Sequence, residues 1–465
     1  MELDHDEENM NFSISRYERM LRSNTVGFFD SNEFENIIHY YLESGKINKA
    51  KRAIQIGLSQ HPSSIGLKLL EIETLIFEDR LDRADALLNQ LHAIEPENEE
   101  IFIQKANIYS KKSQHKKAIW TLRAALDIAN DEADLYSLIG MEYLYMDDFE
   151  HAKSSFMRCL EYDDADYSSL YNLMYCFDFL EQHQEAIDFL NLFLDKNPYS
   201  EVAWHQVGKQ YYDLKEYEKA LAAFDFAIIS DDTFIGAYLE KGKVLERLKR
   251  YQEAIEVYMI TTEIDDPTSF AYLRIGKCYE KLGAKDQALQ YYSMTVREDP
   301  LLDKGWIAIT DYYYKKKNYQ KALYYINKAL AIDSENVFYW KRYARINNKL
   351  NFFEEAERGF DRALELGNYE LETWLQRADV LRKIGEQEAA IQCLYQAIEF
   401  YPDHSEIESR LAILYFDTSN YEKGGYHLEN TLKIDKEYMF ILQDLLGNHF
   451  AHSRVQTVIR QFQRR

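Results

Sequence analysis

The apolar positions of this chain fall into two helical stripes that recur every 34 residues. Repeats counted from Ser31 begin at every 34th residue up to Ser405, so twelve of them cover residues 31–438 without an insertion. We number the places of a repeat from 1 at its first residue. Places 4, 7, 8 and 11 share one stripe and places 20, 24 and 27 share another, which is the 3.6-residue period of amphipathic helices. The pattern predicts an all-α chain in which every repeat is a pair of helices.

Small and bulky residues alternate at fixed places of the repeat. Place 8 is small and is followed twelve residues later by a second small residue, as in Gly140 with Ala152 and Gly208 with Ala220. Small residues at these places allow two helices to pack closely. Place 4 is bulky in most repeats and is held by Phe102, Tyr136, Trp204, Tyr238, Tyr272, Trp306, Trp340 and Trp374. We therefore interpret the four tryptophans among them as core residues.

Prolines mark the ends of the repeats. Five of the six lie multiples of 34 residues apart, and Pro267 is displaced by one place; the five are Pro62, Pro96, Pro198, Pro300 and Pro402. Proline ends a helix because it lacks an N–H donor and clashes with the preceding turn. Asp-rich stretches such as Asp265-Asp266 favour the start of the next helix.

With these places recurring together, the chain resembles the tetratricopeptide repeat (TPR) family, including long bacterial arrays of this repeat. The resemblance implies a right-handed α-α superhelical solenoid of TPR hairpins, with the first helix of each repeat lining a concave groove. Two repeats match less well. The second has Lys68 and Glu71 at places where bulky apolar residues are expected, and the twelfth has Glu408 and Gly424.

The segments outside residues 31–438 are predicted to be caps, because a repeat cannot bury its apolar face alone. Residues 1–30 are predicted to form an acidic tail followed by a short helix that begins at Ser15. Residues 439–465 read as closing helices. The apolar residues expected to cover the two open ends are Tyr17, Met20, Leu21, Ile441, Leu442, Leu445, Leu446, Val455, Val458, Ile459 and Phe462.

Composition argues against several classes of function. A net charge of −24 disfavours nucleic-acid binding, which needs a basic face. We find no apolar run long enough to span a membrane and no secretory leader, so we expect a cytoplasmic protein without a membrane partner. Cys159, Cys176, Cys278 and Cys393 form no closely spaced pair and are predicted to be buried structural thiols.

Motifs for catalysis are absent from the sequence. There is no GxGxxG, no phosphate-binding Gly-Lys-Ser/Thr loop, no HExxH and no GxSxG. His449 and His452 are the nearest approach to a metal pair and are interpreted as solvated. We therefore predict no enzyme activity, no cofactor and no metal.

The predicted inner face carries different side chains along the chain. If places 2, 5, 9, 12 and 13 face inward, the first five repeats contribute acids and an aromatic half of the groove, which consists of Tyr145, Tyr171, Tyr175 and Phe179. Later repeats contribute a basic half, which consists of Lys209, Lys243, Arg247, Lys277, Lys281, Lys315, Arg345 and Lys349. A basic stripe in an acidic protein attracts carboxylates or phosphates, although a charge run can equally be a solvated face.

These features predict a non-enzymatic scaffold for protein–protein interactions. It would bind an extended or helical peptide segment of one or more partners in its groove, through an acidic or an acidic and apolar segment. The alternative is an RNA-processing scaffold of the half-a-TPR type, because Trp340, Tyr343 and Ala344 faintly resemble such repeats and the basic stripe could contact phosphates.

Overall fold

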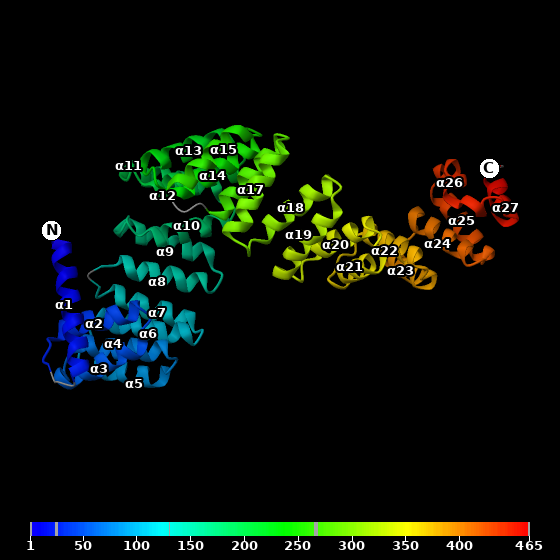
Figure 1. Ribbon diagram of the computed structural model, residues 1–465. Helices are drawn as coiled ribbons and strands as arrows, with labels where there is room; N and C mark the ends of the chain where they lie inside the picture. Colours follow the sequence, from blue (N-terminus) through cyan, green and yellow to red (C-terminus); the bar gives the residue numbers. More distant parts are fainter. Residues whose placement is uncertain (1, 24–26, 130, 265–267, 464–465) are drawn as a thin grey trace. The chain divides into compact units, whose positions relative to one another are not determined.

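A computed structural model of the chain describes residues 2–23, 27–129, 131–264 and 268–463, with side chains from Phe12 onward. These residues form helices and no strands (Figure 1). The chain divides into two units, Met1–Ser230 and Asp231–Arg465, which we call the N-terminal and C-terminal units. Asp265, Asp266 and Pro267, expected to close a repeat, lie outside the described residues.

The N-terminal unit contains six helix pairs, each packed against the next. Their first helices are α2 (Ser31–Glu43), α4 (Ile65–Phe77), α6 (Glu99–Lys111), α8 (Ala133–Leu144), α10 (Tyr167–Phe179) and α12 (Glu201–Asp213). Their second helices are α3 (Ile47–Gln60), α5 (Leu81–His92), α7 (His115–Leu126), α9 (Phe149–Tyr162), α11 (His183–Lys196) and α13 (Tyr217–Ser230).

The C-terminal unit continues with six further pairs. Their first helices are α14 (Ile235–Arg247), α16 (Ser269–Lys281), α18 (Asp303–Lys315), α20 (Val337–Lys349), α22 (Leu371–Ile384) and α24 (Ser405–Asp417). Their second helices are α15 (Tyr251–Ile264), α17 (Lys285–Glu298), α19 (Tyr319–Ile332), α21 (Phe353–Glu365), α23 (Gln387–Phe400) and α25 (Tyr421–Ile434). Every first helix in both units begins where the 34-residue frame places the start of a repeat.

Glycine at place 8 admits an aromatic ring from the second helix of its repeat. A Cβ added at Gly140 would lie 2.6 Å from the Phe156 ring, and one at Gly208 would lie 2.5 Å from Phe224. Both rings are fully buried. The hole at place 8 thus receives the ring at place 24, and the small residue at place 20 is not its main contact.

The turn within each repeat places one residue in the left-handed backbone region. This residue is always at place 15, and in three repeats it is a glycine, namely Gly45, Gly283 or Gly385. In the other nine it is Asp79, Ser113, Asp147, Glu181, Lys215, Lys249, Lys317, Asn351 or Ser419, with φ between 54° and 63°. Non-glycine residues rarely adopt this conformation, so the shared turn is imposed by packing of the two helices.

The N-terminal segment is one long helix, α1 (Glu2–Ser23), and the expectation of a tail with a helix opened by Ser15 was wrong. Acidic residues at a helix start are favoured by the helix dipole, so the stretch that reads as a tail can extend the helix. Tyr17 and Met20 are buried against Phe29 and Phe34 in one cluster, and Leu21 packs on it. These side chains pack against Phe34 of α2.

The C-terminal segment folds as short helices, η1 (Lys436–Phe440), α26 (Leu442–Leu446), η2 (Gly447–His449) and α27 (Ser453–Gln463). One buried cluster joins them to α24 and α25; it includes Leu442, Leu446, Val455, Val458 and Ile459, with Leu445 and Phe462 packed against it. Ile441 is 48% exposed and does not join the cluster.

Each departure in the twelfth repeat has its own partner. The Glu408 carboxylate lies 2.7 Å from Nδ1 of the buried His427, and Gly424 makes room for the Phe416 ring of α24. In this repeat the aromatic ring comes from the first helix and the glycine from the second. At Gly140 the glycine is on the first helix and the ring on the second.

All four cysteines are buried and unpaired, as expected. Burial raises the pKa of each thiol to about 12, which makes them poor nucleophiles at neutral pH. Across the described part of the chain, no helix is long and apolar enough to cross a membrane.

Candidate protein-interaction surface

Four aromatic side chains of the N-terminal unit are exposed on α10 and directly after the end of α8. Tyr145 is 58% exposed, Tyr171 44%, Tyr175 55% and Phe179 60%. We call these four residues the aromatic patch. They are the aromatic half predicted from the sequence, and their exposure leaves large apolar surfaces without an intramolecular cover.

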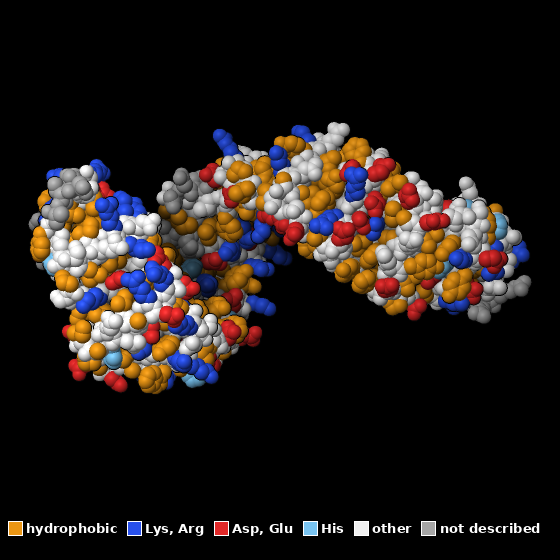
Figure 2. Space-filling view, turned by 90° about the horizontal axis from the view of Figure 1, so that it is seen from below, with side chains coloured by type: hydrophobic (Ala, Val, Ile, Leu, Met, Phe, Trp, Pro, Cys, Tyr) orange, Lys and Arg blue, Asp and Glu red, His pale blue; other side chains and the backbone are white. Residues whose placement is uncertain are grey.

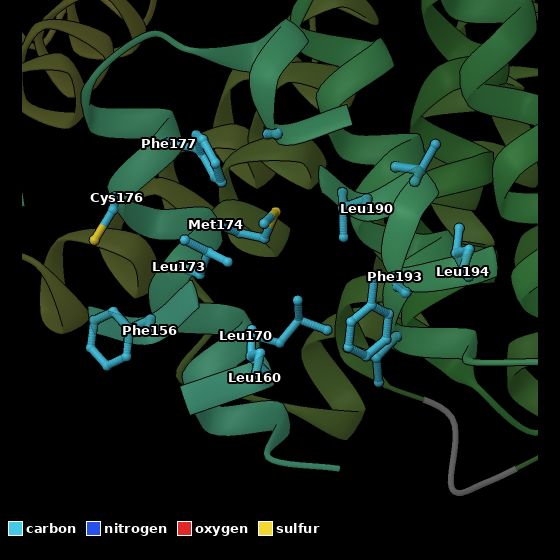
Figure 3. Packing of buried hydrophobic residues seen from close by; sticks show 14 of the residues in the cluster. Phe156, Leu160, Leu170, Leu173, Met174, Cys176, Phe177, Leu190, Phe193 and Leu194 are labelled. Atoms are coloured by element: carbon cyan, nitrogen blue, oxygen red, sulfur yellow. The ribbon is translucent and has the colours of Figure 1, made fainter. Parts of the chain in front are cut away.

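Helix α10 positions three of these rings on one face. Tyr171, Tyr175 and Phe179 are spaced four residues apart, so they lie on one side of the helix. The other side faces the core, where Leu170, Leu173 and Met174 pack with residues of α11 such as Leu190 and Phe193 (Figure 3). The buried face fixes the rotation of α10 and thereby the direction of the exposed rings.

The patch is held by ring contacts beneath it. The nearly buried Phe149 stacks on Phe179, with ring centroids 3.7 Å apart, and meets Tyr175 edge to face at 6.1 Å. Tyr145 packs beside His115 with a centroid distance of 5.7 Å. Rings fixed in this way lose little conformational entropy when a ligand binds.

Helix α8 brings Tyr145 next to α10. The Ser169 hydroxyl donates to the Ser137 hydroxyl at 3.0 Å, and the Asn172 amide contacts the Met141 sulfur at 3.5 Å. Tyr145 follows Met141 by one helical turn, so it lies beside the part of α10 that carries Tyr175 and Phe179.

A polar cluster adjoins the end of α10. The Gln210 amide nitrogen donates to Asp178 Oδ1 at 2.7 Å, and the Gln210 carbonyl oxygen lies 2.8 Å from His183 Nδ1. Asp178, His183 and Asp213 bring possible ligand atoms within 4.8 Å of one another. Two carboxylates and an imidazole could hold a divalent cation; Gln210 already bridges two of them.

The histidine pair near the C-terminus packs into the fold. His449 Nε2 lies 3.1 Å from Asp417 Oδ1, and the His452 ring stacks on Tyr421. The interpretation of these histidines as a solvated pair was therefore wrong, because an aspartate and a tyrosine ring are their neighbours.

Charged side chains of the C-terminal unit pair between consecutive first helices. The Arg274 guanidinium lies 2.7 Å from Glu246, Arg342 lies 2.5 Å from Asp311, and Arg410 lies 3.0 Å from Asp379. We call these three pairs the ion-pair ladder. The three arginines all hold place 6 of their repeats, 68 residues apart.

The predicted basic half divides into paired and unpaired side chains. Lys243 pairs with Glu240, Lys315 with Glu280 and Arg345 with Glu372. Arg247 is not free either. Among the contacts of the described residues, no ion pair or hydrogen bond is made by the side chains of Lys209, Lys277, Lys281 and Lys349.

Lys277 and Lys209 are partly buried, whereas Lys281 and Lys349 are exposed. Burial lowers the pKa of the Lys277 ammonium group, and the positive charge of Arg274 lowers it further. Lys209 lies in the N-terminal unit with the aromatic patch, whereas the other seven residues of the predicted basic half belong to the C-terminal unit.

On much of the face shown in Figure 2, acidic and basic side chains lie next to each other. The charge balance read from the sequence therefore overstates the positive charge that a ligand would meet. The aromatic patch is the part of the predicted site whose large apolar side chains stay exposed on their outer face.

Models of the tetratricopeptide repeat match five segments of the chain. These are residues 99–132, 133–166, 208–262, 270–301 and 371–414. The chain is 31% identical over 86 residues to "BBSome complex member BBS4" of Bos taurus, a match that spans 18% of this chain and 16% of that protein.

Two solved structures are partly similar to this chain. One is the C-terminal part of a TPR repeat-containing protein from Cytophaga hutchinsonii, with 18% identity, a TM-score of 0.44, and coverage of 50% of this chain and 95% of that chain. The other is the APC/C hetero-tetramer Cut9-Hcn1, with 14% identity, a TM-score of 0.36, and coverage of 90% of each chain. With models of one repeat matching segments in both units, and helix pairs recurring at its 34-residue period, this chain is a tetratricopeptide repeat protein.

Proposed function

We propose that this chain is a non-enzymatic scaffold that binds a peptide segment of a partner protein on its first helices. The observation that carries the proposal is the aromatic patch, which presents four exposed rings on a rigid base. Tyrosine and phenylalanine anchors of this kind account for much of the binding energy at protein interfaces. We further propose a cytoplasmic location, since four unpaired thiols suit a reducing compartment.

The partner segment would place apolar or aromatic side chains on the patch. Its acidic residues would meet Lys209, which belongs to the same unit and makes no ion pair or hydrogen bond among the described residues. Lys277, Lys281 and Lys349 are the corresponding candidates for an acidic segment bound within the C-terminal unit. The paired residues of the predicted basic half are poorer candidates, because a ligand carboxylate would have to displace an existing ion pair.

An RNA scaffold is the alternative function. The Trp340 indole N–H donates to the Ser334 carbonyl at 2.8 Å, and its ring packs against Tyr343, so both rings serve the repeat. RNA binding also needs several free cations, and the ladder engages three arginines. These contacts favour a protein partner.

A pull-down from native lysate, with and without nuclease, tests the proposal. Wild type should retain a protein partner after nuclease treatment, and the Tyr171→Ala/Tyr175→Ala variant should lose it. Loss of all partners on nuclease treatment, together with tight binding of single-stranded RNA at physiological salt, would reverse the ranking.

A further inference from the structure

The second repeat lacks an aromatic ring that most other repeats place between their helices. Place 4 of this repeat is Lys68, where nine other repeats carry an aromatic residue, namely Phe34 and the eight Phe, Tyr and Trp residues named above. The contacts of those rings define what is missing around Lys68.

Five of the rings at place 4 pack against a ring on the second helix of their own repeat. Their partners hold places 23, 26 or 30. The stacked or tilted pairs are Trp306 with Tyr325, Tyr272 with Tyr291, Trp204 with Phe226, Trp374 with Phe400 and Tyr136 with Tyr162, with centroids 4.7 to 6.2 Å apart.

Three of the four tryptophans at place 4 also form a recurring hydrogen bond, whereas the buried indole nitrogen of Trp374 has no hydrogen-bond partner among the described residues. The indole N–H donates to the carbonyl oxygen six residues earlier, at 3.0 Å from Trp204 to Pro198 and 2.9 Å from Trp306 to Pro300. Trp340 makes the same bond to Ser334. A ring seated at this place thus meets a fixed acceptor as well as an apolar wall.

In the second repeat the same surroundings form an open pocket of about 250 Å³. We call it the Lys68 socket. It is lined by Leu58, Pro62, Lys68, Glu71, Leu87, Gln90, Leu91 and Ile94. Leu87, Gln90 and Ile94 hold places 23, 26 and 30, and Pro62 stands six residues before Lys68. The socket therefore repeats the seat of a place-4 tryptophan, without the ring.

We propose that the Lys68 socket binds a tryptophan side chain of a partner polypeptide, next to an acidic residue of that partner. Ile94 is 63% exposed at its wall, as expected where a covering ring is missing. Among the described residues Lys68 has no ion pair or hydrogen bond, while Glu71 is engaged by Arg83 at 3.3 Å. The rim thus offers one free positive charge, which selects a carboxylate beside the ring.

The charge at the rim argues against a second copy of this chain as the occupant. Trp120 is 74% exposed and could reach a socket on another molecule. It stands on α7 among Lys116, Lys117 and Arg123, which would bring cations toward Lys68. A different, acidic partner fits the socket better. This site involves the second helices α3 and α5 and is separate from the aromatic patch.

The test uses two fluorinated probes and ¹⁹F NMR line broadening on the full chain. The probes are N-acetyl-5-fluorotryptophanyl-aspartate amide and its lysine counterpart. Wild type should broaden both signals, with about two- to fivefold tighter binding of the aspartate probe, the range of one exposed ion pair. Lys68→Ala should retain binding and abolish that preference.

Filling the socket from within should abolish binding. Lys68→Trp supplies the missing ring, so it should raise the melting temperature and weaken both probes at least about tenfold. Ile94→Lys, at an exposed wall, should also weaken the probes without unfolding the chain. Lys111→Trp adds a tryptophan to the exposed end of α6 and should leave binding unchanged.

Several outcomes would overturn the proposal. These are absence of broadening with wild type, equal broadening with Lys68→Trp, or equal loss with Lys111→Trp. If wild type forms a dimer in sedimentation and Trp120→Ala abolishes it, the occupant is a second copy and the proposed partner is wrong.

Discussion

Place 9 of the repeat has different roles in the two units. Place 9 is Tyr175 in the N-terminal unit, where the ring is 55% exposed, and Asp311 in the C-terminal unit, where Arg342 binds it. The residue at place 6 of the following repeat accounts for the difference. It is Arg342 opposite Asp311, but it is Gln206 in the repeat after Tyr175, buried with no hydrogen-bond partner for its amide among the described residues.

This contrast separates residues that hold the stack from residues that remain available. An ion pair between first helices removes both charges from the surface that a ligand can use. An exposed ring resting on Phe149 keeps its outer face open to a ligand. Charges on a solenoid are thus informative only after their neighbours in adjacent repeats are known.

The largest effect should come from the aromatic patch. Tyr171→Ala with Tyr175→Ala should weaken partner binding by about 2 kcal/mol or more for each ring, mainly through faster dissociation, because aromatic anchors are typical hot spots. Surface plasmon resonance with the identified partner measures it. Calorimetry should find the variant folded with a nearly unchanged melting temperature, and wild-type binding would exclude the patch as the site.

Removing an ion pair of the ladder should instead lower the stability of the fold. Arg342→Ala should lower the free energy of unfolding by about 2 kcal/mol, because it leaves Asp311 partly buried without its partner. Urea unfolding of Arg342→Ala, Asp311→Ala and the double variant gives the coupling energy. Lys349→Ala, which removes an unpaired lysine, is the control and should change stability by less than about 0.5 kcal/mol. A coupling energy near zero would contradict a structural role for the ladder.

A smaller, pH-dependent effect is expected at Lys277. Burial lowers its pKa in the folded state, so the unfolded chain binds more protons between the lowered pKa and about 10.5, and stability rises with pH in that range. At neutral pH the buried charge is a cost. Lys277→Met should therefore stabilise the chain by less than about 1 kcal/mol at pH 7. Wild type should approach the variant as pH rises toward 10; a gap that does not narrow would contradict this account.

The smallest effect should be equal in both units. Lys215 and Lys317 hold place 15 with φ near 60°, and glycine adopts this conformation without steric cost. Lys215→Gly and Lys317→Gly should each stabilise the fold by about 0.5 kcal/mol, as judged by urea unfolding. Gly283→Ala should do the opposite. Different signs in the two units would show that local packing, rather than the shared turn, governs place 15.

The candidate site was partly predictable. The sequence places Tyr171, Tyr175 and Phe179 on one helical face because side chains four residues apart share a side of a helix. It could not reveal that Lys243, Lys315 and Arg345 pair with acids, since two of these pairs join residues of different repeats. Nor does it reveal the Lys68 socket. In the sequence, Lys68 and Glu71 indicate only that the second repeat matches the pattern poorly.

The sequence by itself determined the 34-residue period, the twelve helix pairs and most of the buried residues that flank them, with Ile441 as an exception, because these follow from local spacing and from the burial that each helix requires. Only the tertiary structure decided the ring that fills Gly208, the left-handed turn at Lys215 and the pairing of Arg342 with Asp311. Each of these features depends on a contact between two helices. The repeat pattern treats such contacts as equivalent in every repeat, but the side chain that faces the residue decides which contact forms.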